Sequence, residues 1–89
     1  MTHMLVRHRV ADFPTWKRVF DSHAAAQRAA GLHVRLVLRR RDDPAEVVLL
    51  FDVEDVERAT GFVTSPEVPD AKVASGVVDR PEIVFLEDA

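Results

Sequence analysis

The stretch of sequence that decides the fold is EVVLLFDV, residues 46–53. Successive side chains of an extended segment point to opposite faces, so the run VVLLF places branched and aromatic side chains on both faces. A strand that is apolar on both sides is typical of the interior of a sheet whose two faces are both covered. Residues 46–53 are therefore predicted to form a central strand.

The segment before this strand is predicted to be its hairpin partner, residues 32–40. Its side chains alternate between two faces, one bearing Val34, Leu36 and Leu38 and the other bearing His33, Arg35, Val37 and Arg39. The intervening RDDP, residues 41–44, has the aspartate and proline chemistry of a turn. The two strands are therefore expected to pair as a β-hairpin.

The N-terminal part is predicted to form a strand followed by a helix. Residues 3–10 alternate between an apolar face with one histidine and a more polar face, namely Met4, Val6, His8 and Val10 against His3, Leu5, Arg7 and Arg9. Asp12 offers a carboxylate that caps free amide groups, and a following proline suits a first helical turn. The helix is expected to end at Gly31, after one stripe of Trp16, Phe20, His23, Gln27 and Ala30.

The C-terminal part supplies the remaining elements. Asp55 is expected to cap a helix over residues 56–63, Ser65-Pro66 to start a third helix that ends before Gly76, and residues 82–86 to form the last strand. The order strand, helix, strand, strand, split helix, strand is that of a ferredoxin-like split βαβ sandwich. The predicted fold is α+β, one domain over residues 1–89, with a four-stranded antiparallel sheet and its helices on one face.

Composition and charge exclude several classes of protein. The 89 residues contain no cysteine, so disulfides, thiolate metal sites and cysteine nucleophiles are excluded. Residues 1–41 hold nine Lys and Arg against two Asp and Glu, and residues 42–89 hold three against thirteen. The basic residues are interleaved with apolar positions, so basic and acidic elements are expected side by side rather than as a nucleic-acid-binding face. The start has no signal-peptide run, and residues 47–51 are too short to span a bilayer, so a cytoplasmic protein without membrane contact is expected.

Helices on one face leave the other face of the sheet bare, and a bare apolar face marks an interface. The bare face is predicted to carry Val47, Leu49 and Phe51, with Ile83 or Phe85, or else the alternates Val48 and Leu50. On the first two strands the same face is predicted to bear Arg7, Arg9, Arg35 and Arg39. A homodimer with a partly polar interface is therefore expected.

The chain resembles small proteins of the dimeric α+β barrel superfamily. The resemblance rests on VRHRV, DF, WK and VFDSH within residues 6–23, RRDDP before the central strand, FVTSPEV at residues 62–68 and IVFLE at residues 83–87. It is greatest to the antibiotic biosynthesis monooxygenase-like group, whose short members include polyketide cyclases. The resemblance implies that two sheets pair as a barrel, that each subunit keeps a pocket between sheet and helices, and that no cofactor is required.

Two histidines are the candidate catalytic residues. His8 lies on the more apolar face of the first strand and His23 on the helix stripe, so both are expected to face the space between helix and sheet. Neutral imidazole removes a proton from a phenol or enol at neutral pH. The alternative is that each is a structural side chain, hydrogen-bonded in the core or at a wet rim. Two histidines without a third ligand are too few for a firm metal site, so no metal is predicted.

The remaining candidates are substrate-binding side chains. They are Trp16 for stacking on an aromatic ligand, Phe20 and Phe62 as apolar wall or core, Asp52 for orienting a histidine or accepting a proton, and Arg35 for holding an enolate or carboxylate.

Two functions remain open. One is a cofactor-free monooxygenase or cyclase acting on an aromatic or polyketide-like substrate by proton abstraction. The other is a non-catalytic homodimer that binds a small hydrophobic ligand or supports a biosynthetic enzyme.

Overall fold

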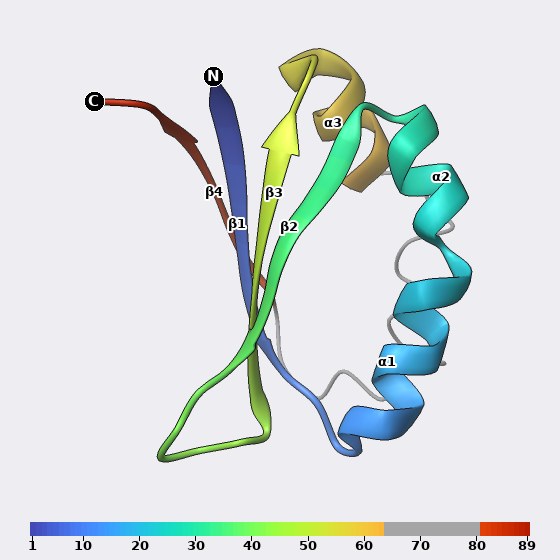
Figure 1. Cartoon of the computed structure of the whole chain (residues 1–89), viewed down its shortest axis with the longest axis vertical. Helices are drawn as coiled ribbons and strands as arrows, with labels where there is room; N and C mark the ends of the chain where they lie inside the picture. The colour runs from blue at the N-terminus through green and yellow to red at the C-terminus, as the bar shows by residue number, and fades with distance from the viewer. Residues whose placement is uncertain (64–80) are drawn as a thin grey trace.

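The computed structural model describes residues 1–63 and 81–89 of the chain. The strands of this part form one antiparallel sheet in the order β2-β3-β1-β4. Their bounds are Thr2–Arg9 for β1, Leu32–Arg39 for β2, Glu46–Val53 for β3 and Glu82–Glu87 for β4. Helices α1 (Phe13–Ser22), α2 (Ala24–Ala29) and α3 (Val56–Val63) lie to one side of the sheet (Figure 1). The predicted ferredoxin-like α+β fold is confirmed.

The helix-facing side of the sheet holds the core. β3 lies inside the sheet as predicted, and its register pairs Val47, Leu49 and Phe51 with His8, Val6 and Met4 of β1. All six of these side chains are buried. Apolar area removed from water in this way contributes roughly 25 cal/mol per Å² to folding. The prediction that Val47, Leu49 and Phe51 line the bare face is therefore wrong, and their alternates Val48 and Leu50 line it instead.

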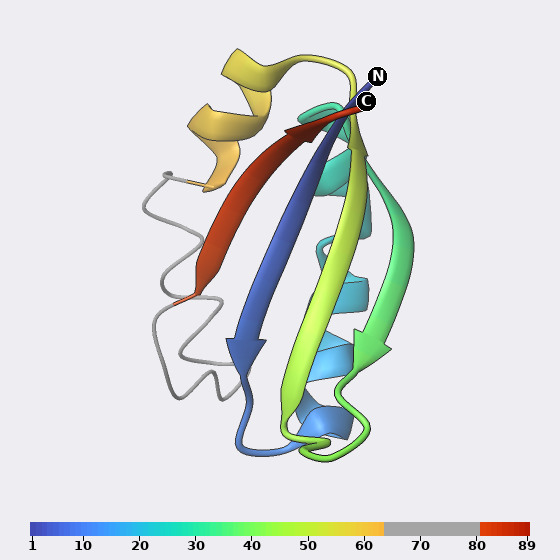
Figure 2. The same cartoon turned by 90° about the vertical axis from the view of Figure 1, so that its left-hand side faces the viewer.

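The opposite side of the sheet is uncovered by any described helix (Figure 2). The register aligns four apolar side chains in one row across this face, namely Leu36, Leu50, Leu5 and Val84. We call these four residues the bare-face row. Ile83 and Phe85, predicted on this face, pair with Val6 and Met4 and so lie on the helix side. The reason is the antiparallel register of β4, which places Val84 and Leu86 outward.

A β-bulge in β2 changes which residues share a face. The register shifts between Val34, which pairs with Phe51, and Leu36, which pairs with Leu50. Because the side-chain period of a strand is two, one extra residue reverses the faces beyond it. The predicted grouping of Val34, Leu36 and Leu38 on one face is therefore wrong. Arg39 was expected on the bare face, but it lies on the helix side, where its guanidinium carbon is 4.2 Å from the centre of the Phe13 ring.

The first helix is shorter than predicted because it is interrupted at His23. That residue separates α1 from α2, and its backbone (φ −96°, ψ 5°) departs from helical values. Beyond the break the stripe continues, since Gln27 is buried. Gly31 has φ +78° and ends α2, as expected of a left-handed stop.

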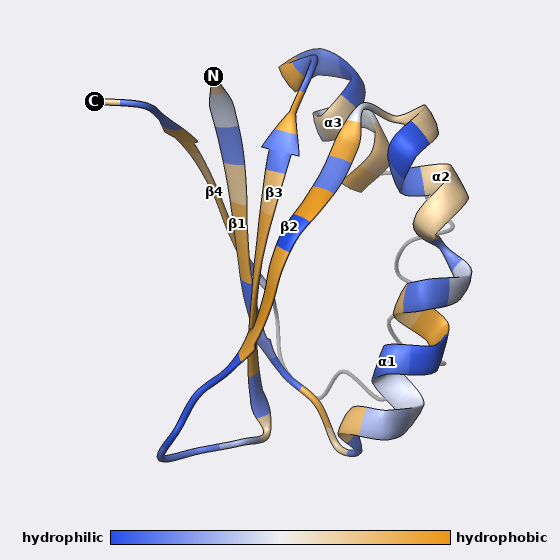
Figure 3. Cartoon of the chain, in the orientation of Figure 1, coloured by the Kyte–Doolittle hydropathy of each residue, from blue (hydrophilic) through white to orange (hydrophobic). Residues whose placement is uncertain are grey.

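The helix cap at Asp55 is also confirmed. Its Oδ1 accepts hydrogen bonds from the backbone N–H groups of Glu57 and Arg58 at 2.9 and 3.3 Å. The third helix predicted from Ser65-Pro66 lies outside the described residues. Among residues 1–63 and 81–89, none of the helices has the length and apolar character needed to cross a bilayer. The strands β2 and β3 are mainly apolar, whereas the loop that joins them is hydrophilic (Figure 3).

Candidate active site

A row of aromatic rings joins α1 to the sheet. Trp16 is 3% exposed and stacks on Phe20 with ring centres 4.9 Å apart. Its other neighbour is the imidazole of His8, edge-on at 5.5 Å, and Phe20 in turn contacts Phe51 at 6.3 Å. We call His8, Trp16, Phe20 and Phe51 the aromatic row. It joins the only tryptophan of the chain to one of the two candidate bases.

The local sequence explains why α1 presents these rings to the sheet. Asp12 begins the helix, because its Oδ2 accepts a hydrogen bond from the Thr15 N–H at 3.1 Å. The Thr15 side chain and backbone together lower the pKa of the Asp12 carboxyl, which therefore stays ionised as a cap. Trp16 and Phe20 are four residues apart and so lie on the same side of the helix.

A groove lies between α1–α2 and the edge strand β2. Its volume is ≈ 320 Å³, within the range of small-molecule sites. The wall is formed by apolar side chains with one buried amide, and the rim by charged groups: Phe20, Leu32, Val34, Val37, Ala24 and Gln27 in the wall, and Lys17, Asp21, Arg28 and His33 at the rim. Lys17 is paired with Asp21 at 2.6 Å. We call this space the edge groove.

The two candidate histidines flank the aromatic row but do not line the edge groove. His8 is 7% exposed and contacts Trp16, and neither of these two residues lines the groove. His23 is half-buried and stands between Phe20 and Gln27 on the helix stripe, where both of these neighbours line the groove. The backbone carbonyl of His23 accepts the Gln27 N–H at 2.9 Å.

The other predicted residues are divided between the two sides of the sheet. Trp16 and Phe20 belong to the aromatic row, and Phe62 of α3 packs half-buried against the core. Asp52 and Arg35 lie on the bare face, 3.4 Å apart between Oδ1 and a guanidinium nitrogen. The histidine that Asp52 contacts is His3, whose Nδ1 lies 2.9 Å from its Oδ1, and not one of the two candidate bases. The structure therefore brings Asp52 and Arg35 together, and places them apart from the aromatic row.

A polar cluster at the end of β1 was not predicted from the sequence. The imidazole of His3 lies between two carboxylates, with Nε2 2.6 Å from Asp88 and Nδ1 2.9 Å from Asp52. Asp88 also accepts a hydrogen bond from the N-terminal ammonium at 3.0 Å. The hydrogen bond to Asp88 and, after it, the one to Asp52 raise the pKa of His3, and the same contact lowers the pKa of Asp88. Only the pairing of β1 with β3 and β4 reveals this cluster.

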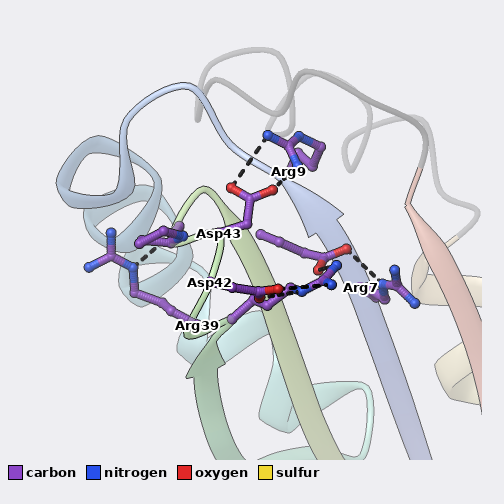
Figure 4. A network of polar contacts seen from close by, with 8 residues as sticks. Arg7, Arg9, Arg39, Asp42 and Asp43 are labelled. Atoms are coloured by element: carbon purple, nitrogen blue, oxygen red, sulfur yellow. Dashed lines mark hydrogen bonds and ion pairs between the residues drawn. The ribbon is translucent and has the colours of Figure 1, made fainter.

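The hairpin end of the sheet carries a network of arginines and carboxylates (Figure 4). The carboxylate of Glu46 bridges Arg7 at 2.7 Å and Arg40 at 3.2 Å, and these two guanidinium groups lower its pKa. Arg9 pairs with Asp43, and the Nε of Arg39 donates to the Pro44 carbonyl at 3.0 Å. A shallow hollow of ≈ 460 Å³ adjoins this network. The arginines that line this hollow already have partners within the hairpin end of the sheet. The network therefore stabilises the hairpin.

No group of three metal-ligating side chains suited to an ion occurs within residues 1–63 and 81–89. The wall of the edge groove is apolar apart from Gln27, and its charged groups lie at the rim. The chemistry available here is that of aromatic contact, hydrogen bonding and proton transfer by imidazole.

Known proteins share the fold of this chain, although none is close to it in sequence. The chain matches none of the protein-family models, and it matches none of the curated proteins. Solved structures do match over almost the whole chain. A protein of Bordetella bronchiseptica, assigned by name to the antibiotic biosynthesis monooxygenases, is 15% identical with a TM-score of 0.78, over 99% of this chain and 96% of that one. The chain has the fold of the antibiotic biosynthesis monooxygenase-like proteins.

Two further structures extend this likeness. A protein of Nitrosomonas europaea with the same assigned name is 19% identical, with a TM-score of 0.69, over 99% of this chain and 98% of that one. A variant of SnoaB, a cofactor-independent oxygenase from Streptomyces nogalater, is 19% identical with a TM-score of 0.71, over 98% and 91%. At these identities the likeness is one of fold, and it agrees with the resemblance to the dimeric α+β barrel superfamily.

Proposed function

We propose that this protein is a cofactor-independent monooxygenase or cyclase that acts on an aromatic or polyketide-like substrate. The observation that carries the proposal is the aromatic row, in which Phe20, at the wall of a ligand-sized groove, stacks on Trp16, and Trp16 contacts the imidazole of His8. Rings of this kind bind flat aromatic molecules. The fold is shared with SnoaB, which is a cofactor-independent oxygenase.

In the proposed reaction His8 or His23 acts as general base. Neutral imidazole takes a proton from an activated CH₂ or phenol of the substrate and leaves a resonance-stabilised carbanion. In oxygenation the carbanion reacts with dioxygen, one oxygen atom forms the new carbonyl, and the other leaves as water with the two hydrogens of the CH₂. In cyclisation the carbanion attacks a carbonyl carbon of the same molecule, and the imidazolium returns its proton to the new alkoxide.

The two histidines have different support for this role. His23 stands on the helix stripe between two groove residues, Phe20 and Gln27, although its own side chain does not line the groove. His8 is the more buried of the two and contacts Trp16. Its place in the aromatic row is the support for His8.

The experiment is an oxygen-uptake and product assay on a tricyclic phenolic ketone with an acidic CH₂. The base variant, His8→Ala or His23→Ala, is expected to lower the rate roughly a hundredfold or more, a usual loss for a positioned base. Arg18→Ala, at an exposed position of α1, is the matched control and should leave the rate unchanged. Full activity in the double alanine variant would exclude both histidines as the base.

One observation favours the second candidate, a non-catalytic ligand-binding or accessory protein. Neither His8 nor His23 lines the edge groove, so a ligand held there contacts apolar side chains and Gln27 first. The same assay separates the two functions. A binding protein would bind the ketone and yet consume no oxygen and release no cyclised product.

We also propose that the protein is a homodimer joined through the bare face. The support is the bare-face row together with Leu38 and Leu86, since Leu36, Leu38, Val84 and Leu86 are 37–47% exposed in the single chain. Apolar side chains gathered on one face of a small protein mark an interface. The polar clusters around His3 and Glu46 lie at the two ends of this face and would form the rim.

A further inference from the structure

Gln27 is the polar residue in the apolar wall of the edge groove. It is 7% exposed, although its side chain carries an amide. Its backbone N–H donates to the His23 carbonyl, but its side-chain amide makes no hydrogen bond with any of residues 1–63 and 81–89. The surrounding wall residues, Phe20, Leu32 and Val37, have no polar side-chain atom to offer it. Within the described part of the chain, this amide is therefore left to hydrogen-bond a molecule that enters the groove.

The chemistry of an amide defines what suits that position. A glutamine side chain carries two N–H donors and one carbonyl acceptor, and it is neutral at every pH of interest. It can pair with a hydroxyl or a carbonyl of a ligand. A hydrocarbon of the same shape would strip the amide of solvent and return no hydrogen bond, and a buried polar group left unpaired is costly.

The wall around the amide defines the rest of the ligand. The ring of Phe20 is held flat against Trp16, and Leu32, Val34 and Val37 form the opposite side from β2. A groove of ≈ 320 Å³ is at the small end of ligand sites. These limits describe a flat molecule of two or three fused rings.

We infer that Gln27 is the specificity-determining residue of the edge groove, and that it selects flat apolar ligands by hydrogen-bonding one ring hydroxyl or carbonyl. The inference deepens the proposed function and rests on it for the role of the groove as a substrate site. It assigns Gln27 to recognition and not to proton transfer, because a carboxamide acts as neither acid nor base at neutral pH.

The test compares two probes with one ring skeleton, 2-naphthol and naphthalene. Each is titrated into the ¹⁵N-labelled full chain, and the amide shifts of Phe20, Leu32 and Val37 report binding in the groove. Gln27→Met keeps the length of the side chain and removes the amide. The substitution is expected to weaken the affinity for 2-naphthol by roughly 3- to 10-fold, which is the contribution of one hydrogen bond. The affinity for naphthalene should change by no more than about twofold. Arg18→Met, exposed on α1 outside the groove, should change neither affinity.

Three outcomes would overturn the inference: shifts confined to residues away from the groove, equal weakening of both probes by Gln27→Met, or no binding of 2-naphthol. The wild-type chain provides a test even if the Met variant does not fold, since equal affinity for the two probes also contradicts it. The readout is separate from activity. A chain that prefers 2-naphthol through Gln27 but shows no turnover contradicts only the proposed reaction, whereas turnover without this preference contradicts only the role of Gln27.

Discussion

Trp16 connects more of the core than any other aromatic side chain in the described part of the chain, with rings of His8, Phe13 and Phe20 all within 6 Å of its own. We expect Trp16→Ala to lower the free energy of unfolding by about 3–5 kcal/mol, because it removes a buried aromatic and leaves a cavity. Phe85→Ala, at a 37% exposed position, is the matched control and should cost clearly less. Denaturant titration measures both, and a loss under about 1 kcal/mol for Trp16→Ala would place its ring outside the core.

The stability that His3 contributes is expected to depend on pH. The contact with Asp88, followed by that with Asp52, raises its pKa above the ordinary value of 6.5. The stabilisation that its protonated ring contributes is therefore complete below pH 6.5 and is lost as the pH rises through the higher pKa of the folded state. NMR titration of the ring is expected to show a raised pKa that falls back in Asp88→Asn. An unchanged pKa in that variant would show that Asp88 does not hold the ring.

At the scale of elements, the hydrophobic pattern predicted most of the fold and failed where the backbone departs from regular geometry. The central strand was predicted over residues 46–53, and β3 has the same bounds. The pattern of β2 could not show its bulge, because alternation looks the same with or without one extra residue. Phe20 and Gln27, predicted on one stripe, both line the edge groove, whereas His23 of the same stripe lies at the break between α1 and α2. The resemblance implied a pocket between sheet and helices, but the residues that line the edge groove were not predicted, since the bulge decides that Val37 faces the helices while Leu36 and Leu38 face away.

The two glycines of the described residues differ in what an added side chain would meet. Gly31 has φ +78°, and a Cβ there would lie 3.3 Å from the Cβ of Glu54, so Gly31→Ala is expected to cost about 1–2 kcal/mol. Gly61 lies within α3, where a Cβ would meet nothing within 4 Å. Gly61→Ala should therefore stabilise by up to about 1 kcal/mol through helix propensity. Thermal unfolding measures both, and the same sign for the two substitutions would contradict the role given to Gly31.

At the scale of the whole molecule, the uneven charge of the sequence is resolved by the strand order. The basic strands β1 and β2 each lie beside an acidic neighbour from the second half of the chain. Glu46 accordingly pairs with Arg7, Asp43 with Arg9, and Asp52 with Arg35. The expectation that basic and acidic elements lie side by side is confirmed. The composition could predict that they adjoin, but not which pairs form, because pairing depends on register.

The bare face of the sheet is expected to join two copies of the chain. Leu36 and Leu50 are register partners in the bare-face row and point away from the core, so lysine at both positions should leave the fold intact. Two copies would then bring four charges into an apolar contact, and a buried unpaired charge is strongly unfavourable. We expect the wild type to sediment as a dimer at tens of micromolar, as an order of magnitude at which a stable dimer persists, and Leu36→Lys with Leu50→Lys to sediment as a folded monomer. Val56→Lys, exposed on α3 away from this face, should remain dimeric. A monomeric wild type, or a dimeric double variant, would show that the bare face does not join two copies.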